Sequence, residues 1–385
     1  MKRLDILSIA LAALLSAACG SRSSYTAADF DREVYTPAYA TGFDIRGKHG
    51  DAATLITVRD PWQGARSQVQ RLLVLRNGAE APAGFDGQVV EAPVSRIVCL
   101  SSSHVALFDA LGEVRRIKGV SGIDYIANPY IRGHRLCGEV RDIGYDTAPD
   151  FETLAALRPQ LAFIYGVAGE NGALTGKLRE LNIPYIYIGD YLEPSPLGKA
   201  EWLMVAAEVC DCPDRGREIF GGIAERYNAL AQRIGQHVAQ TGRRPKALLN
   251  TPYRDTWFMP PARNYMVRLI RDAGGDTHTV SDEGNASLPV DMEQACLLAA
   301  GADVWLNVGS CRSLAELKAA NPRFAGIPAV RSGQVFNNDR RRTPAGGSDF
   351  WESGATHPDL ILRDLAAIFH PDLAADTLVY YRQLR

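Results

Sequence analysis

Three adjacent arginines near the C-terminus are candidates for binding an acidic ligand. Arg340, Arg341 and Arg342 follow an apolar stretch that reads as a strand ending at Asn337. A planar guanidinium donates several hydrogen bonds in a fixed fork, which suits carboxylate and phosphate groups. We therefore expect these arginines to contact acid groups of a ligand, with one of the three pointing away. The alternative is that the three arginines are solvent-exposed surface charges without a role in binding.

Aromatic side chains near strand ends are a second set of candidates. Trp257 and Phe258 follow a predicted strand at residues 246–250, and Trp351 follows the last apolar strand of the chain. Rings in such positions could line a site for a large, flat or partly apolar ligand. Trp257 is the strongest candidate because it lies in a turn-rich stretch. For each ring taken alone, packing in a core remains the alternative.

The sequence offers no catalytic group. Ser102 and Ser103 follow a predicted strand at residues 96–100 and could donate hydrogen bonds to a ligand, but no base stands in a defined relation to them. Gly-x-Ser-x-Gly, Walker A and Gly-x-Gly-x-x-Gly motifs are absent. The 7 histidines include no i, i+4 pair, which a helical metal site would favour. We expect a binding protein without catalytic residues, cofactor or resident metal ion.

The first residues have the pattern of an export signal. Two basic residues, an apolar run at residues 6–15 and three small residues precede Cys19. The apolar run is too short to span a bilayer permanently. Cys19 directly after small residues resembles a bacterial lipobox, in which the leader is cut before a lipid-bearing cysteine. We expect a leader at 1–18, a lipid anchor on Cys19 and a tether at 19–42. A secreted protein without lipid is the alternative.

Composition indicates an ordinary globular protein. Hydrophobic residues make up 46% and charged residues 22%, with a net charge of −2, which argues against a nucleic-acid partner. In an exported chain, the cysteines beyond Cys19 permit either disulfides or buried free thiols. They are Cys99, Cys137, Cys210, Cys212, Cys296 and Cys311.

Hydrophobic patterns divide the rest of the chain into four parts. Residues 43–90 alternate as antiparallel strands do, and residues 91–192 alternate strands with helices, which is typical of an α/β lobe. Residues 193–241 are a helical connector that opens with a Ser-Pro helix start, and residues 242–385 form a second α/β lobe. The predicted fold class is therefore α/β, with two Rossmann-like lobes, a ligand cleft between them and a long helical connector.

Two glutamates occupy equivalent positions in the two lobes. Glu152 and Glu293 each stand at the start of a helix that leads into an apolar strand. A carboxylate at a helix start also interacts favourably with the helix dipole, by up to about 1 kcal/mol. The repeated position is the reason to look for a shared role.

Several stretches resemble the periplasmic binding proteins for ferric siderophores, haem and cobalamin, whose lobes are joined by a helix. They extend over residues 94–372. The first is a strand, a Ser-rich loop and an Ala-Leu-Gly helix end; the second is a Glu-led helix with its strand entry; the last two lie in the second lobe. They occupy residues 96–112, 150–161, 269–275 and 332–335.

This resemblance implies the solute-binding component of an ABC importer in the periplasm or cell envelope. Such a protein delivers an iron chelate (a ferric siderophore or haem) or a corrinoid to a permease dimer with its ATPase. In the family, one glutamate per lobe docks on the permease, which implies that role for Glu152 and Glu293. Tyr145 occupies the position of the tyrosine that ligates iron in haem-binding members. A tyrosine at the cleft edge is the alternative.

The sequence leaves the ligand open among ferric siderophore, haem and corrinoid. Two other functions also stay open: a receptor for a bare metal ion, and a surface lipoprotein that captures ligand without transport. We expect a monomer, and only modest lobe closure because the connector is helical.

Overall fold

The computed structural model describes residues 27–385 except 83, 146–147, 168, 255, 282–283, 285 and 374–376. The predicted leader, Cys19 and the first part of the tether lie outside the described residues. None of the described helices is long and apolar enough to cross a membrane.

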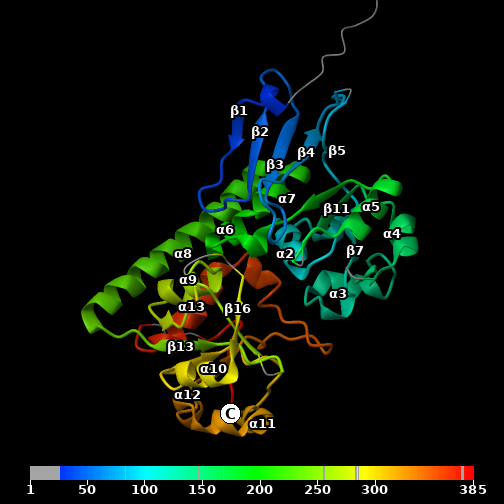
Figure 1. Cartoon of the computed structure of the whole chain (residues 1–385). Coiled ribbons are helices and arrows are strands. Elements are labelled where there is room, and N and C mark those ends of the chain that lie inside the picture. Colours follow the sequence, from blue (N-terminus) through cyan, green and yellow to red (C-terminus); the bar gives the residue numbers. More distant parts are fainter. Residues whose placement is uncertain are drawn as a thin grey trace, which may run out of the picture.

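The described part of the chain opens with a five-stranded sheet, at the top of Figure 1. Its strands are antiparallel except for the last pair, which is parallel. In sheet order they are β1 (Arg32–Tyr35), β2 (Phe43–Gly47), β3 (Thr54–Arg59), β4 (Val69–Leu75) and β5 (Gln88–Glu91). The expectation of a tether as far as residue 42 was wrong, because β1 pairs with β2 and Phe30 is buried.

A buried carboxylate ties this first sheet to the rest of the molecule. Glu201 is the last residue of α6 (Pro196–Glu201) and is fully buried. It accepts hydrogen bonds from the hydroxyl of Tyr35 and the N–H groups of residues 38–40, at 2.6–2.8 Å. Because buried N–H groups need partners, this one side chain fixes the path of the segment between β1 and β2.

The first α/β lobe is built on a parallel sheet in the order β12-β11-β6-β7-β8. Its strands β6, β11 and β12 are buried on both faces, as expected of apolar parallel strands that are covered on both sides. The strands are β6 (Ile97–Cys99), β7 (Ile117–Val120), β8 (Arg141–Asp142), β11 (Leu161–Ile164) and β12 (Tyr185–Tyr187), and the helices are α2 (Ser102–Ala110), α3 (Pro129–Arg135), α4 (Phe151–Leu157) and α5 (Gly172–Glu180).

The first sheet also covers the free edge of this parallel sheet. The side-chain amide of Gln70 in β4 donates to the carbonyl of Tyr185 at 3.0 Å and accepts from the N–H of Tyr187 at 2.8 Å. It therefore takes the place of a neighbouring strand beside β12. Covering an edge in this way prevents pairing with other chains.

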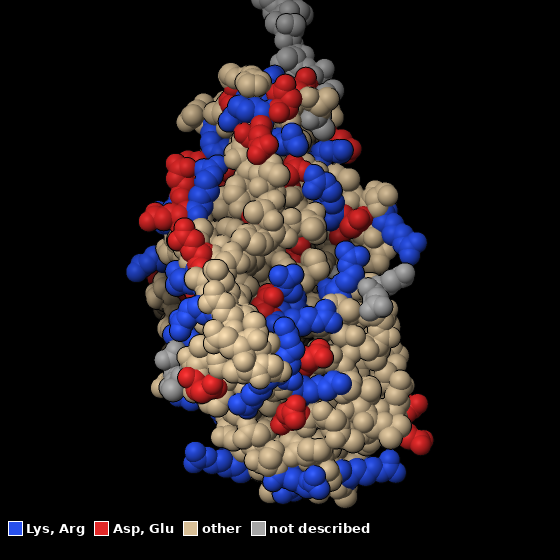
Figure 2. Space-filling view, turned by 90° about the vertical axis from the view of Figure 1, so that its left-hand side faces the viewer, with Lys and Arg blue, Asp and Glu red and all other residues tan. Residues whose placement is uncertain are grey.

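The connector consists of three helices rather than one. α6 and α7 (Leu203–Val209) are short, and α8 (Pro213–Thr241) has 29 residues, which corresponds to about 44 Å at the usual helical rise. α8 packs on α7 and on α13 (Pro358–Phe369) of the second lobe. It projects to the left in Figure 1, and Figure 2 shows that acidic and basic side chains are interspersed on this side.

The second lobe repeats the plan with a sheet in the order β15-β13-β17-β18-β19, parallel except for β19. A separate pair, β14 (Thr256–Met259) and β16 (Leu288–Asp291), is antiparallel. The sheet strands are β13 (Lys246–Leu249), β15 (Asp276–Thr277), β17 (Val304–Leu306), β18 (Val335–Asn337) and β19 (Arg382–Gln383), and the helices before α13 are α9 (Tyr265–Asp272), α10 (Met292–Ala299), α11 (Leu314–Ala320) and α12 (Pro328–Arg331).

The predicted α/β fold with two lobes and a helical connector is therefore confirmed. The six described cysteines form no disulfide with one another. Cys99 and Cys210 are buried free thiols, one of the two possibilities that the sequence left open, whereas Cys137 is exposed and the other three are partly buried.

Candidate functional site

A cavity of about 340 Å³ lies between the lobes, and we call it the cleft cavity. Ser102 and Tyr125 line it from the first lobe, where they follow β6 and β7. Gly309, Arg342 and Trp351 line it from the second lobe, where they follow β17 and β18. All five residues lie beyond the carboxyl ends of parallel strands, which is where open α/β sheets bind ligands.

A hairpin-shaped segment of the second lobe supplies much of this lining. We call residues 338–352, which follow β18, the arm. Thr343 and Gly347 close its turn, since the Thr343 N–H donates to the Gly347 carbonyl at 2.8 Å and the Gly347 N–H donates to the Thr343 hydroxyl at 3.0 Å. Arg342 and Ser348 form an antiparallel bridge across it. The arm is thus an ordered projection from the second lobe toward the first.

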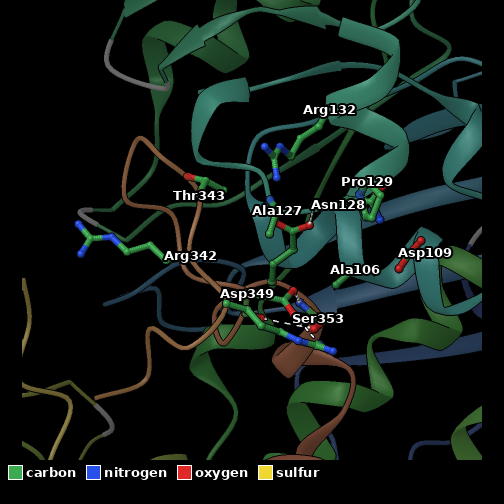
Figure 3. A pocket seen from close by; sticks show the side chains of 12 residues that line it. Ala106, Asp109, Ala127, Asn128, Pro129, Arg132, Arg342, Thr343, Asp349 and Ser353 are labelled. Atoms are coloured by element: carbon green, nitrogen blue, oxygen red, sulfur yellow. Dashed lines mark hydrogen bonds and ion pairs between the residues drawn. The ribbon is translucent and has the colours of Figure 1, made fainter. Parts of the chain in front are cut away.

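A second cavity, of about 430 Å³, lies beside the arm, and we call it the side cavity. It is bounded by α2, by the start of α3 and by the arm (Figure 3). In that view Arg132 of α3 is directed toward Ala127 and Thr343, whereas Arg342 extends to the far side of the arm. Arg342 lines both cavities, so it connects them.

The three predicted arginines have different surroundings. Arg340 is exposed and lines neither cavity. Arg341 is paired with Asp349 at 3.0 Å and lies over the ring of Tyr380. Within the described residues, the one ion-pair partner of Arg342 is Asp339, at a distance of 3.8 Å.

Asp339 is itself bound more closely by another arginine. Arg382 donates a hydrogen bond to one carboxylate oxygen of Asp339 at 2.9 Å, and its Nε lies 2.8 Å from the other oxygen as an ion pair. Arg132 forms no ion pair within the described part of the chain. Arg132 and Arg342 are therefore cations from opposite lobes that are available to an acidic ligand. Arg132 was not among the site residues predicted from the sequence.

Trp257 is not a ligand-binding residue, and this prediction was wrong. It lies on β14, is fully buried and stacks on Trp305 with ring centroids 5.5 Å apart. Its indole N–H donates to the carbonyl of Leu249 at 2.9 Å. Phe258, the next residue, points to the opposite face as strand geometry requires and is exposed, but it lines neither cavity.

Three other exposed rings lie at the cleft. Trp351 is 46% exposed and lines the cleft cavity. Tyr145 is 54% exposed, and its ring centroid is 6.4 Å from that of Tyr125. Tyr145 follows β8 and Tyr125 follows β7, so both rings lie at the carboxyl edge of the parallel sheet of the first lobe. An exposed ring at this edge is available to pack on a ligand.

The two predicted serines also differ. Ser102 lines the cleft cavity. Ser103 is buried, with its hydroxyl 3.0 Å from that of Ser101, the residue that caps α2. Ser103 is therefore part of the helix start, and its assignment to the ligand site was wrong.

Glu152 and Glu293 occupy matching positions. Each is exposed and lies in the first turn of its helix, α4 or α10. Each helix is capped by an aspartate that accepts a backbone hydrogen bond, Asp150 from Thr153 at 2.9 Å and Asp291 from Gln294 at 2.8 Å. The structural repeat therefore extends to the caps, while the docking role stays a prediction.

Comparison with known proteins identifies the class. The profile of the periplasmic binding protein family matches residues 97–341, which is more than half of the chain. The chain therefore belongs to this family, as its resemblance indicated, and the family consists of solute-binding transport proteins. The first sheet precedes the matched region.

The individual proteins that match this chain share only low sequence identity with it. An uncharacterized lipoprotein of Methanocaldococcus jannaschii, MJ0878, is 26% identical over 305 residues, covering 76% of this chain and 69% of that protein. A periplasmic haem-binding protein of Pseudomonas aeruginosa has a TM-score of 0.57 at 17% identity, covering 76% of this chain and 98% of that one. The vitamin B12-binding protein BtuF of Vibrio cholerae has a TM-score of 0.50 at 15% identity, covering 72% and 97%. At these identities the two structures show a shared fold.

Proposed function

We propose that this protein captures a large, partly flat metal chelate with acid groups, either an iron chelate such as haem or a ferric siderophore, or a corrinoid. The observation that carries the proposal is the lining of the cleft: the rings of Tyr125 and Trp351 face it from opposite lobes, and Arg342 lies beside them. Aromatic faces suit a flat or apolar ligand body, and guanidinium groups suit its carboxylates.

We further propose that the bound chelate is handed to an ABC permease and its ATPase. The family relationship and the matched positions of Glu152 and Glu293 support this proposal. A lipid on Cys19 would keep the receptor near that permease. Two relatives from Methanocaldococcus jannaschii are named lipoproteins, which supports a lipid anchor.

A receptor for bare metal ions has less support. Among the described residues, no three His, Cys, Asp or Glu side chains lie close enough together to hold a metal ion. Capture of such an ion would need several of these ligands from both lobes.

Spectroscopic titration tests the proposed ligand class. The whole protein is titrated with haemin, with cyanocobalamin and with a ferric catecholate siderophore, following the Soret band, the corrinoid bands and quenching of tryptophan fluorescence. We expect saturable binding of one chelate at one molecule per chain. If none of the three binds, the proposed ligand class is wrong.

Replacement of Arg132 or Arg342 by alanine is expected to weaken binding of that chelate about tenfold. A hydrogen bond to a charged group contributes about 1.5 kcal/mol, and 1.4 kcal/mol corresponds to a factor of ten. Isothermal titration calorimetry measures the change. Arg340→Ala is the control, because Arg340 lines neither cavity; a loss as large in the control would contradict the assignment.

A further inference from the structure

The lobes are joined by a buried contact at the edge of the side cavity. Glu352, at the end of the arm, is only 3% exposed. Its two carboxylate oxygens accept hydrogen bonds from the N–H groups of Ala127 at 2.6 Å and Asn128 at 2.7 Å. These residues precede α3 in the first lobe, so one side chain of the second lobe holds two backbone groups of the first.

A second close approach lies five residues earlier in the arm. A Cβ atom added at Gly347 would clash with the backbone carbonyl oxygen of Tyr125. The backbone of Gly347 is not in the left-handed region. The local backbone conformation would accept an L-residue. Glycine is therefore needed at this position because the two lobes leave no space for a side chain.

These two contacts join the segments that carry the ligand-facing side chains. The arm carries Arg342 and Trp351, and the segment that it touches in the first lobe carries Tyr125 and Arg132. Within the arm, the Arg341–Asp349 ion pair and the Thr343 turn fix its shape. A shift of the arm relative to the first lobe would therefore move Arg342 and Trp351 away from Tyr125 and Arg132.

We propose that Glu352 and Gly347 form an interlobe clasp that positions Arg342 and Trp351 against Tyr125 and Arg132, so that the ligand site is complete only when the clasp is closed. Glu352 is a positioning residue, since it faces backbone groups of the other lobe. The contact itself is independent of the ligand, whereas its effect on affinity rests on the proposed function.

The clasp should weaken as the pH rises. Burial, with a smaller contribution from Asp349, raises the pKa of Glu352 to about 7, although its two backbone hydrogen bonds act in the opposite direction. With the clasp open, the carboxyl is solvated and returns toward its ordinary pKa of 4.5. Between pH 4.5 and about pH 7, the carboxyl of Glu352 is therefore protonated in the closed clasp and ionised in the open one. The preference for the closed clasp falls as the pH rises through this range.

Other charged groups surround this carboxyl and are unchanged in a Glu352→Gln variant. Comparison with that variant therefore isolates the titration of Glu352. The surrounding groups are Asp109 of α2, Arg132 of α3, Arg341, Arg342 and Asp349 of the arm, and His357 before α13.

Hydrogen exchange in the unloaded protein tests the clasp directly. We expect the amides of Ala127 and Asn128 to exchange about tenfold faster in Glu352→Ala and in Gly347→Ala than in the wild type. That factor corresponds to loss of one hydrogen bond of about 1.4 kcal/mol. After correction for intrinsic exchange, their protection should fall from pH 6 to pH 8 in the wild type but not in Glu352→Gln.

Arg340→Ala is the matched control, because Arg340 is exposed on the arm, lines neither cavity and makes no contact across the lobes among the described residues. Its amide protection should equal that of the wild type. Unchanged exchange in folded Glu352→Ala or in Gly347→Ala would overturn the clasp.

The positioning role is tested with haemin and cyanocobalamin on the same variants. Glu352→Ala and Gly347→Ala should release a bound chelate about tenfold faster, with little change in association rate, and Glu352→Gln should restore part of the loss. Faster amide exchange with unchanged chelate release would overturn the positioning role. Failure of the wild type to bind either chelate would count against the proposed function, and the exchange result would still decide whether the clasp exists.

Discussion

Replacing both Glu152 and Glu293 by lysine is expected to lower uptake of the bound chelate roughly 1,000-fold, because each lobe would lose one charge contact with the permease. Breaking a buried charge pair at an interface costs about 2–5 kcal/mol, so two such losses remove about 4 kcal/mol. Both glutamates are exposed and lie outside the two cavities. Chelate affinity should therefore be unchanged.

Uptake into cells that express the permease measures this effect, with calorimetry as the parallel measurement of affinity. Glu225→Lys is a suitable control, because Glu225 is also an exposed helical glutamate but lies on the connector. Normal uptake by the double variant would show that the paired glutamates are ordinary helix-start residues. Loss of affinity would show that their role had been assigned to the wrong surface.

Replacing Glu201 by alanine is expected to lower the free energy of unfolding by about 3–4 kcal/mol. The carboxylate accepts from Tyr35 and from the N–H groups of residues 38–40. Each buried donor left without a partner costs about 1–3 kcal/mol. The first sheet should therefore loosen from the connector.

Urea denaturation followed by circular dichroism measures this change. Glu218→Ala is the control, because Glu218 is exposed on α8, and surface substitutions usually stay within about 0.5 kcal/mol. If Glu201→Ala were as stable as this control, the segment between β1 and β2 would be held by other contacts.

The lobes and connector were predictable because their signals are local. The apolar strand at residues 161–164 is buried on both faces, as a continuous hydrophobic run predicts. Helix starts at Asp150 and Ser195 had capping residues at the expected positions. Glu152 and Glu293 were found because the repeat preserves the order of elements in both lobes.

The parts of the site that were missed depend on contacts distant in sequence. Glu352 meets Asn128 across 224 positions, and no local pattern marks such a pair. Arg132 lies on α3, whose Asn-Pro start is a helix signal that could have been read. Trp257 was misassigned because its turn-rich neighbours conceal that residues 256–259, Trp257 among them, form a strand that pairs with β16.

The start of the first sheet was missed for a related reason. β1 is only four residues long and partly exposed, with charged residues at two of its positions. Its place in the sheet depends on pairing with β2 and on the hydrogen bonds to Glu201. A short edge strand of this kind gives little signal before its partners are known.

The central claim is that one chelate is held between the two lobes. Hydrogen exchange in the presence and absence of the chelate that binds tests it most directly, because the protected amides identify the binding surface. We expect protection on both lobes, at residues 101–103 and 122–132 of the first and at residues 309–310 and the arm of the second. Protection confined to one lobe, or to surfaces outside the cleft, would contradict the account.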